Sequence, residues 1–126
     1  MEFEVSKELM SKQLEVLEKV KAKGKIKIGV NEVTKAIERE KAKFVFIAKD
    51  VSPKEIVMHL PLICEDKNIP YSFVDKKEDL GKKAGIEVGT SAIAIIEEGP
   101  LRKEVHDLAK KISELNPKIK VKELKD

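Results

Sequence analysis

Five consecutive apolar residues, Phe44 to Ala48, are the feature of this sequence that most constrains its fold. Lysines at positions 43 and 49 flank the run on both sides. A strand without polar alternation is typical of the centre of a sheet, where both faces are buried. The run therefore predicts a central strand covered by helices on both sides.

Shorter strand patterns alternate with helical patterns along most of the chain. The other expected strands are residues 25–28, 71–74 and 92–96. The expected helices are 7–23, 31–40, 52–68, 77–84 and 101–115. The expected N-caps of the first three are Ser6, Asn31 and Ser52, and Pro61 is expected to interrupt the third. We predict an α/β fold, a three-layer α-β-α sandwich with a mixed sheet of about four strands.

Length and composition indicate one domain over residues 1–126, ending in a basic tail at 117–126 in which Ile119 and Val121 could pair as an edge strand. Cys64 is the only cysteine, so an internal disulfide is impossible. No run of 18 apolar residues is present, and the first residues do not resemble a secretory signal. We expect an intracellular, cytoplasmic protein that is a monomer when free.

Groups suited to catalysis are few. His59 and Cys64 are the nearest pair of zinc-binding residue types, and a zinc site normally needs four ligands. We expect Cys64 to be a buried apolar residue and His59 to lie at a helix end or on the surface. The glycines at 81 and 85 do not match a phosphate-binding loop. The sequence predicts no catalytic residue, no metal site, no cofactor and no enzymatic activity.

Positive charge is concentrated in residues 19–43, which hold nine Lys or Arg and three acids. Local basicity of this kind can attract a phosphate backbone. A solvated helix face is the alternative, and charge alone does not decide between them.

Within this segment, Asn31, Lys35 and Arg39 are spaced four apart, which aligns them along one side of a helix. Glu32 lies beside them at the helix start. A carboxylate is out of place in a purely phosphate-binding surface, but it can accept hydrogen bonds from a guanine edge. Asn31 can donate and accept, Lys35 can donate to a base, and Arg39 can reach a phosphate. The alternative is an Asn cap with ordinary surface charges.

Two other segments are candidates for the same surface. Ile86 and Val88 lie between Gly85 and Gly89, so this loop either packs on the core, which we favour, or offers an exposed apolar cap for an unstacked base. Lys76-Lys77 follows a strand and precedes a helix, within reach of a bound backbone.

Several motifs occur in one order that resembles a known family. They are KIGVNEVTKAIER at 27–39, FVFIAKDVSP at 44–53, HLPLICEDKNIPY at 59–71, and Lys77-x-x-Leu80-Gly81. Together they resemble the archaeal L7Ae large-subunit ribosomal proteins, the kink-turn-binding family. The resemblance covers roughly residues 8–112.

The resemblance implies an α-β-α sandwich that binds RNA kink-turns and is not catalytic. Tandem sheared G·A pairs would be read by Asn31, Glu32 and Lys35, while Gly29 would let the backbone approach the RNA. Arg39 and Lys77 would contact the RNA backbone or neighbouring bases. The loop Ile86, Glu87 and Val88 would cover a nucleotide flipped out of the kink.

The resemblance also implies partners. They are ribosomal RNA, the guide RNAs of box C/D and H/ACA particles, ribonuclease P RNA, and, in the box C/D particle, fibrillarin and a Nop-type scaffold protein. One departure concerns Ile28, which stands where archaeal members commonly have lysine, so that either one phosphate contact is missing or Lys27 supplies it. A second reading, a protein-interaction adaptor with the same fold and no specific RNA target, stays open.

Overall fold

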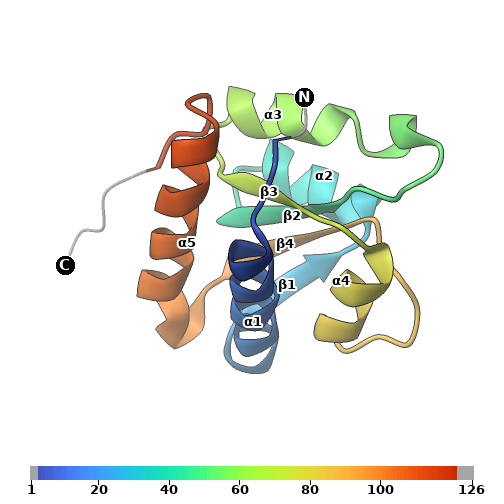
Figure 1. Cartoon of the computed structure of the whole chain (residues 1–126), viewed down its shortest axis with the longest axis horizontal. Coiled ribbons are helices and arrows are strands. Elements are labelled where there is room, and N and C mark those ends of the chain that lie inside the picture. The colour runs from blue at the N-terminus through green and yellow to red at the C-terminus, as the bar shows by residue number, and fades with distance from the viewer. Residues whose placement is uncertain (1–2, 122–126) are drawn as a thin grey trace.

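A mixed sheet of four strands forms the centre of the computed structural model, which describes residues 3–121 (Figure 1). Its strands are β1 (Lys25–Ile28), β2 (Phe44–Ala48), β3 (Tyr71–Val74) and β4 (Ala92–Glu97), in the order β1-β4-β2-β3. β2 pairs in parallel with β3 and antiparallel with β4, and β1 pairs antiparallel with β4. All five residues of β2 are buried, which confirms the predicted central strand.

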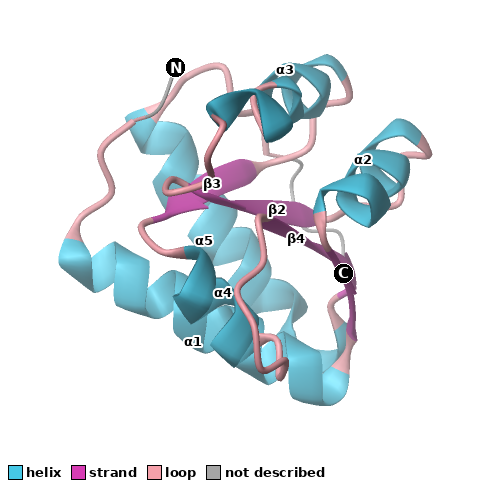
Figure 2. Ribbon diagram, turned by 90° about the vertical axis from the view of Figure 1, so that its right-hand side faces the viewer, coloured by secondary structure: helices cyan, strands magenta, loops and turns pink. Residues whose placement is uncertain are grey.

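Helices cover both faces of the sheet (Figure 2). α1 (Lys7–Lys23), α4 (Lys77–Lys83) and α5 (Arg102–Leu115) lie on one face, and α2 (Val30–Glu38) and α3 (His59–Asp66) lie on the other. The three-layer prediction is therefore confirmed over the described residues.

The first helix begins and ends as the sequence predicts. The Oγ of Ser6 accepts a 3.2 Å hydrogen bond from the backbone N–H of Leu9, and the helix ends before Gly24. Its residues Val16, Leu17 and Val20 recur at helical spacing and are buried against the sheet.

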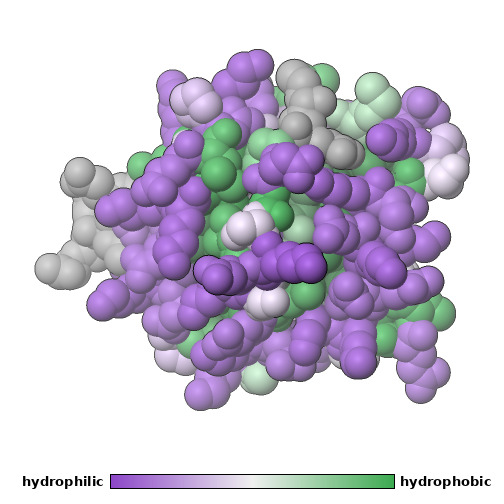
Figure 3. Space-filling view, viewed as in Figure 1, coloured by the Kyte–Doolittle hydropathy of each residue, from purple (hydrophilic) through white to green (hydrophobic). Residues whose placement is uncertain are grey.

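One continuous apolar core lies between the layers. Phe44 and Phe46 bring their ring centroids to 4.9 Å at its centre. Charged residues, 39% of the chain, lie mainly outside this core. Figure 3 shows a surface dominated by hydrophilic residues, with apolar side chains visible between them. None of the helices within residues 3–121 is long and apolar enough to cross a membrane.

The predicted N-cap of the second helix was wrong. α2 begins at Val30, and Gly29 occupies the N-cap position with φ 95° and ψ 151°. Glycine alone adopts this backbone conformation readily, so the chain turns directly from β1 into α2. Asn31 consequently lies in the first turn of the helix, where its side chain is exposed.

The predicted helix over 52–68 was also wrong in its first half. Ser52 caps no helix; a short 3-10 helix, Lys54–Ile56, follows, and α3 begins only at His59. Pro61 is the third residue of α3, within the first turn, where a backbone N–H has no intrahelical partner. Proline is therefore tolerated near the start of this helix instead of interrupting it.

The suggested edge strand in the tail is not found in its described part. Residues 119–121 form no strand, although Ile119 is buried at 4% exposure. The backbone N–H of Ile119 donates to the carbonyl of Asn116 at 3.0 Å, so the chain turns after α5. The remainder of the basic tail, 122–126, lies outside the described residues.

Candidate nucleic-acid interface

One end of the sheet collects most of the predicted site residues. Because β1, β2 and β3 run in the same direction and β4 runs in the opposite one, the ends of three strands meet the beginning of β4 there. The backbone N–H of Gly29 donates to the carbonyl of Ala92 at 2.9 Å, which joins the start of α2 to β4. The N–H of Thr90 donates to the carbonyl of Lys77 at 3.0 Å, which joins the loop before β4 to α4.

The second helix presents the predicted polar stripe to solvent. Its apolar residues Val33, Ala36 and Ile37 are buried against the sheet. The polar residues are all exposed, namely Asn31, Glu32, Lys35 and Arg39. Within residues 3–121, the side chains of Asn31 and Arg39 are free of hydrogen bonds and ion pairs to the protein. Their donors and acceptors are therefore available to a ligand.

Glu32 and Lys35 form an ion pair with each other. The Nζ of Lys35 lies 3.5 Å from the Oε2 of Glu32, and the two side chains are 59% and 47% exposed. A pair this exposed contributes little to stability and can be exchanged for contacts with a ligand. The pair also holds the carboxylate and the ammonium side by side on the first turns of α2.

A hollow of about 320 Å³ lies between α2 and the neighbouring β-strands. Its lining residues are Lys27, Glu32, Lys35, Ala36, Arg39, Lys41 and Ile96. The structure thus brings Lys27 of β1 beside the cations of α2. Sequence reasoning missed Lys41 and Ile96, although the basic composition of residues 19–43 was a signal for the former.

The loop before β4 does not pack on the core as the sequence analysis favoured. Val88 is 70% exposed, Glu87 is exposed, and only Ile86 is partly buried. The main chain of the loop approaches α4 closely, since a Cβ atom on Gly81 would collide with the carbonyl oxygen of Val88. The loop is held to α4 through its main chain, and the side chain of Val88 points outward.

Lys77 is the first residue of α4 and its side chain is exposed at the same end of the sheet. Its backbone N–H donates a 2.8 Å hydrogen bond to Oδ1 of Asp50, at the end of β2. Asp50 thus caps α4 from a distant part of the sequence.

His59 and Cys64, the nearest pair of zinc-binding residue types, both lie on α3. Cys64 is fully buried, as predicted, and burial raises the pKa of its thiol. His59 is half-buried at the start of α3, with Nε2 2.8 Å from Oγ1 of Thr34. Because the Thr34 hydroxyl donates to the carbonyl of Val30 at 2.7 Å, His59 donates to Thr34 and joins α3 to α2. Among residues 3–121, no three His, Cys, Asp or Glu side chains gather as metal ligands.

Fold and site together define a class: small α-β-α sandwiches that expose polar side chains at the start of one helix. Residues 11–105 match the profile of the Ribosomal protein L7Ae/L30e/S12e/Gadd45 family, and the chain belongs to this family. It is also similar to a solved structure described as Giardia lamblia 15.5kD RNA binding protein, at 37% sequence identity and a TM-score of 0.85. That similarity covers 88% of this chain and 92% of the other. The expected family is confirmed at this level, and archaeal origin stays a prediction.

Proposed function

We propose that this protein binds structured RNA and recognises the kink-turn. The observation that carries the proposal is the exposed group of Asn31, Glu32 and Lys35 on the first turns of α2, directly after the bare backbone of Gly29. Membership of the family, and the similarity to a protein described as RNA-binding, support RNA as the ligand. The roles of the individual residues are part of the proposal.

The chemistry of the first turns suits mismatched purine pairs. Glu32 accepts hydrogen bonds from guanine N–H groups, and Asn31 donates and accepts at the same time. Lys35 donates to the acceptor edge of the base once the ligand displaces it from Glu32. A kinked internal loop exposes these edges, whereas the major groove of a regular A-form helix is too deep and narrow for side chains.

The neighbouring elements complete the proposed interface. The loop of Ile86, Glu87 and Val88 offers an exposed apolar cap that covers a nucleotide flipped out of the stack. Lys77 on α4 and Arg39 at the end of α2 take the sugar–phosphate backbone on either side. Gly29 has no atom within 4 Å of an added Cβ, so its surface is open to close approach by the RNA.

The proposed targets are kink-turns in ribosomal RNA, in box C/D and H/ACA guide RNAs and in ribonuclease P RNA. The protein, a monomer when free, stabilises the bend and nucleates particle assembly without catalysis. Fibrillarin and a Nop-type scaffold are the proposed protein partners. Met58 and Leu62 are exposed apolar side chains that line one hollow beside α3, and they support a protein partner on that side. Loss of scaffold recruitment, but not of RNA binding, in Leu62→Lys would test that assignment.

A matched pair of substitutions tests the RNA proposal. Glu32→Gln keeps the size of the side chain and removes the carboxylate that accepts from guanine, whereas Glu114→Gln makes the same change at an exposed position of α5, on the opposite face of the sheet (Figure 2). We expect Glu32→Gln to weaken binding to a kink-turn RNA by roughly 1–3 kcal/mol, and to weaken binding much less when its G·A pairs are replaced. Equal effects of the two substitutions would refute base recognition by Glu32.

A further inference from the structure

The hollow between α2 and the neighbouring strands has an excess of positively charged side chains. Four cations line it, Lys27, Lys35, Arg39 and Lys41, against the single carboxylate of Glu32. Lys27, Arg39 and Lys41 make no ion pair within the described chain, whereas Lys25, at the start of β1, is paired with Glu97 at 3.8 Å. Unpaired cations facing one hollow repel each other, and an anionic ligand removes that repulsion.

Backbone hydrogen bonds at the end of α2 fix the position of Lys41. α2 ends in a Schellman motif, in which the N–H of Glu40 donates to the carbonyl of Ile37 at 2.9 Å and the N–H of Lys41 donates to that of Ala36 at 2.8 Å. Glu40 takes the left-handed position of this motif, with φ 56°. The two hydrogen bonds fold Lys41 back against the end of the helix.

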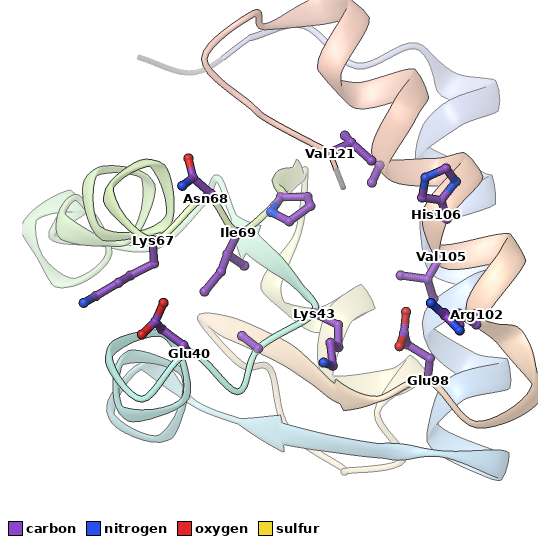
Figure 4. A pocket seen from close by; sticks show the side chains of 13 residues that line it. Glu40, Lys43, Lys67, Asn68, Ile69, Glu98, Arg102, Val105, His106 and Val121 are labelled. Atoms are coloured by element: carbon purple, nitrogen blue, oxygen red, sulfur yellow. The ribbon is translucent and has the colours of Figure 1, made fainter. Parts of the chain in front are cut away.

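The same turn separates charges onto two sides of the molecule. Lys41 lines the hollow described above, whereas Glu40 and Lys43 line a different one near α5 (Figure 4). In Figure 4, Lys43 lies between Glu40 at one side of the hollow and Glu98 and Arg102 at the other, so that hollow holds both signs of charge. The hollow beside α2 therefore keeps its positive excess.

The wall opposite α2 is shaped by an irregularity in the sheet. The register between β1 and β4 shifts between Lys25 and Ile26, because Lys25 pairs with Glu97 and Ile26 pairs with Ile95. Ile96 is the extra residue, and its half-buried side chain lines the hollow with Ala36. A bulge of this kind re-aims a side chain, here to give the hollow an apolar floor between its cations.

We infer that this hollow is a phosphate-binding extension of the RNA interface in which Lys41 and Lys27 hold the sugar–phosphate backbone of one strand as it leaves the base-reading surface. The inference rests on the proposed function. Glu32 and Lys35 border both surfaces, so a strand that contacts them continues into the hollow without a gap.

Salt dependence of binding tests this assignment, since removing one lysine–phosphate interaction lowers the slope of log affinity against log salt by about 1. The probe is a kink-turn RNA, and the variants are Lys41→Ala and Lys43→Ala, which make the same charge change two residues apart. We expect Lys41→Ala to lower the slope by about 1 and to weaken binding severalfold. Lys43→Ala and Lys41→Arg should both keep the slope of the wild-type protein.

The outcomes separate this inference from the proposed function. Equal slopes for Lys41→Ala and Lys43→Ala would overturn the phosphate site, even where the wild type discriminates between intact and G·A-disrupted RNA. Equal wild-type affinity for those two RNAs would overturn kink-turn recognition, while the comparison of the two lysines would still decide whether the hollow holds a phosphate. Thermal unfolding of each variant verifies the fold, because both side chains are exposed.

Discussion

Asp50 and Lys77 join two sides of the candidate interface through a single hydrogen bond, in which the backbone N–H of Lys77 donates to Oδ1 of Asp50 at 2.8 Å. Lys76, at the N-cap position of α4, makes no capping bond of its own, so Asp50 from the end of β2 supplies it. The carbonyl of Lys77 then accepts from the N–H of Thr90 at 3.0 Å. These two bonds fix α4 and the loop before β4 relative to the sheet.

Removing this cap should loosen α4 and the loop together. We expect Asp50→Ala to lower the free energy of unfolding by about 1 kcal/mol, the usual cost of removing a helix cap. Denaturant unfolding measures the change, and Asp107→Ala, an exposed carboxylate on α5, is the control. A loss no greater than that of the control would show that Asp50 does not hold α4.

Gly29 should be sensitive to any side chain. Its φ of 95° and ψ of 151° strain an alanine by roughly 1–3 kcal/mol, although the added Cβ meets no atom within 4 Å. We expect Gly29→Ala to lose stability and, beyond that, RNA affinity, because the methyl group stands on the proposed RNA surface. Gly99→Ala, at the opposite end of the sheet and crowded by the carbonyl of Lys23, should lose stability alone. Unchanged RNA affinity in folded Gly29→Ala would contradict close approach of the RNA at this position.

Replacing Glu40 by glycine should raise stability, whereas the substitutions at Asp50 and Gly29 should lower it. With φ at 56°, it occupies a position of the Schellman motif where glycine is usual. We expect Glu40→Gly to raise the free energy of unfolding by roughly 0.5–1 kcal/mol, since the left-handed conformation then carries no Cβ strain. Glu40→Ala keeps the strain and should give no such gain in thermal unfolding. An equal gain from both would point to the charge of Glu40 as the cause.

The single tyrosine should report on the core at alkaline pH. Burial, and then its 2.5 Å hydrogen bond to Glu65, raise the pKa of Tyr71 above its usual value near 10. The folded state therefore keeps the phenolic proton at a pH where the unfolded chain releases it. Its contribution to stability is complete below pH about 10 and is lost as the pH rises toward the raised pKa of the folded state.

Phenolate absorbance of the native protein measures this prediction. We expect no phenolate signal at the pH where a free tyrosine is half ionised, and a steeper alkaline loss of stability in the wild type than in Tyr71→Phe. That variant is the reference because it lacks only the phenolic hydroxyl, so that all other ionisable groups are common to both proteins. Ionisation of Tyr71 near its usual pKa in the folded protein would contradict the effect of burial.

The layers of the fold could be predicted because apolar periodicity is a local signal. The continuous run of β2 and the helical spacing of Val16, Leu17 and Val20 each required burial of a defined face, and the structure buries those faces. The start of a helix was less predictable where two nearby residues could each serve as its N-cap. At the start of α2, the backbone freedom of Gly29 took precedence over the side-chain capping ability of Asn31.

Spacing along one helix predicted the polar side chains that α2 exposes. Asn31, Glu32 and Lys35 share a face by spacing alone, so their exposure followed from the burial of Val33 and Ile37. Asp50, Lys41 and Ile96 reach the site through strand order, a helix-ending turn and a register shift, none of which is written in local sequence spacing. The RNA roles assigned to these residues stay predictions.

The affinity of the wild-type protein for two RNAs that differ only in the G·A pairs of one kink-turn is the most direct test of kink-turn recognition. In a fluorescence competition assay at fixed salt, we predict at least tenfold tighter binding to the intact kink-turn, the ratio that about 1.4 kcal/mol of base recognition produces. Equal affinity for the intact RNA and for the RNA with Watson–Crick pairs in place of the G·A pairs would contradict the proposal.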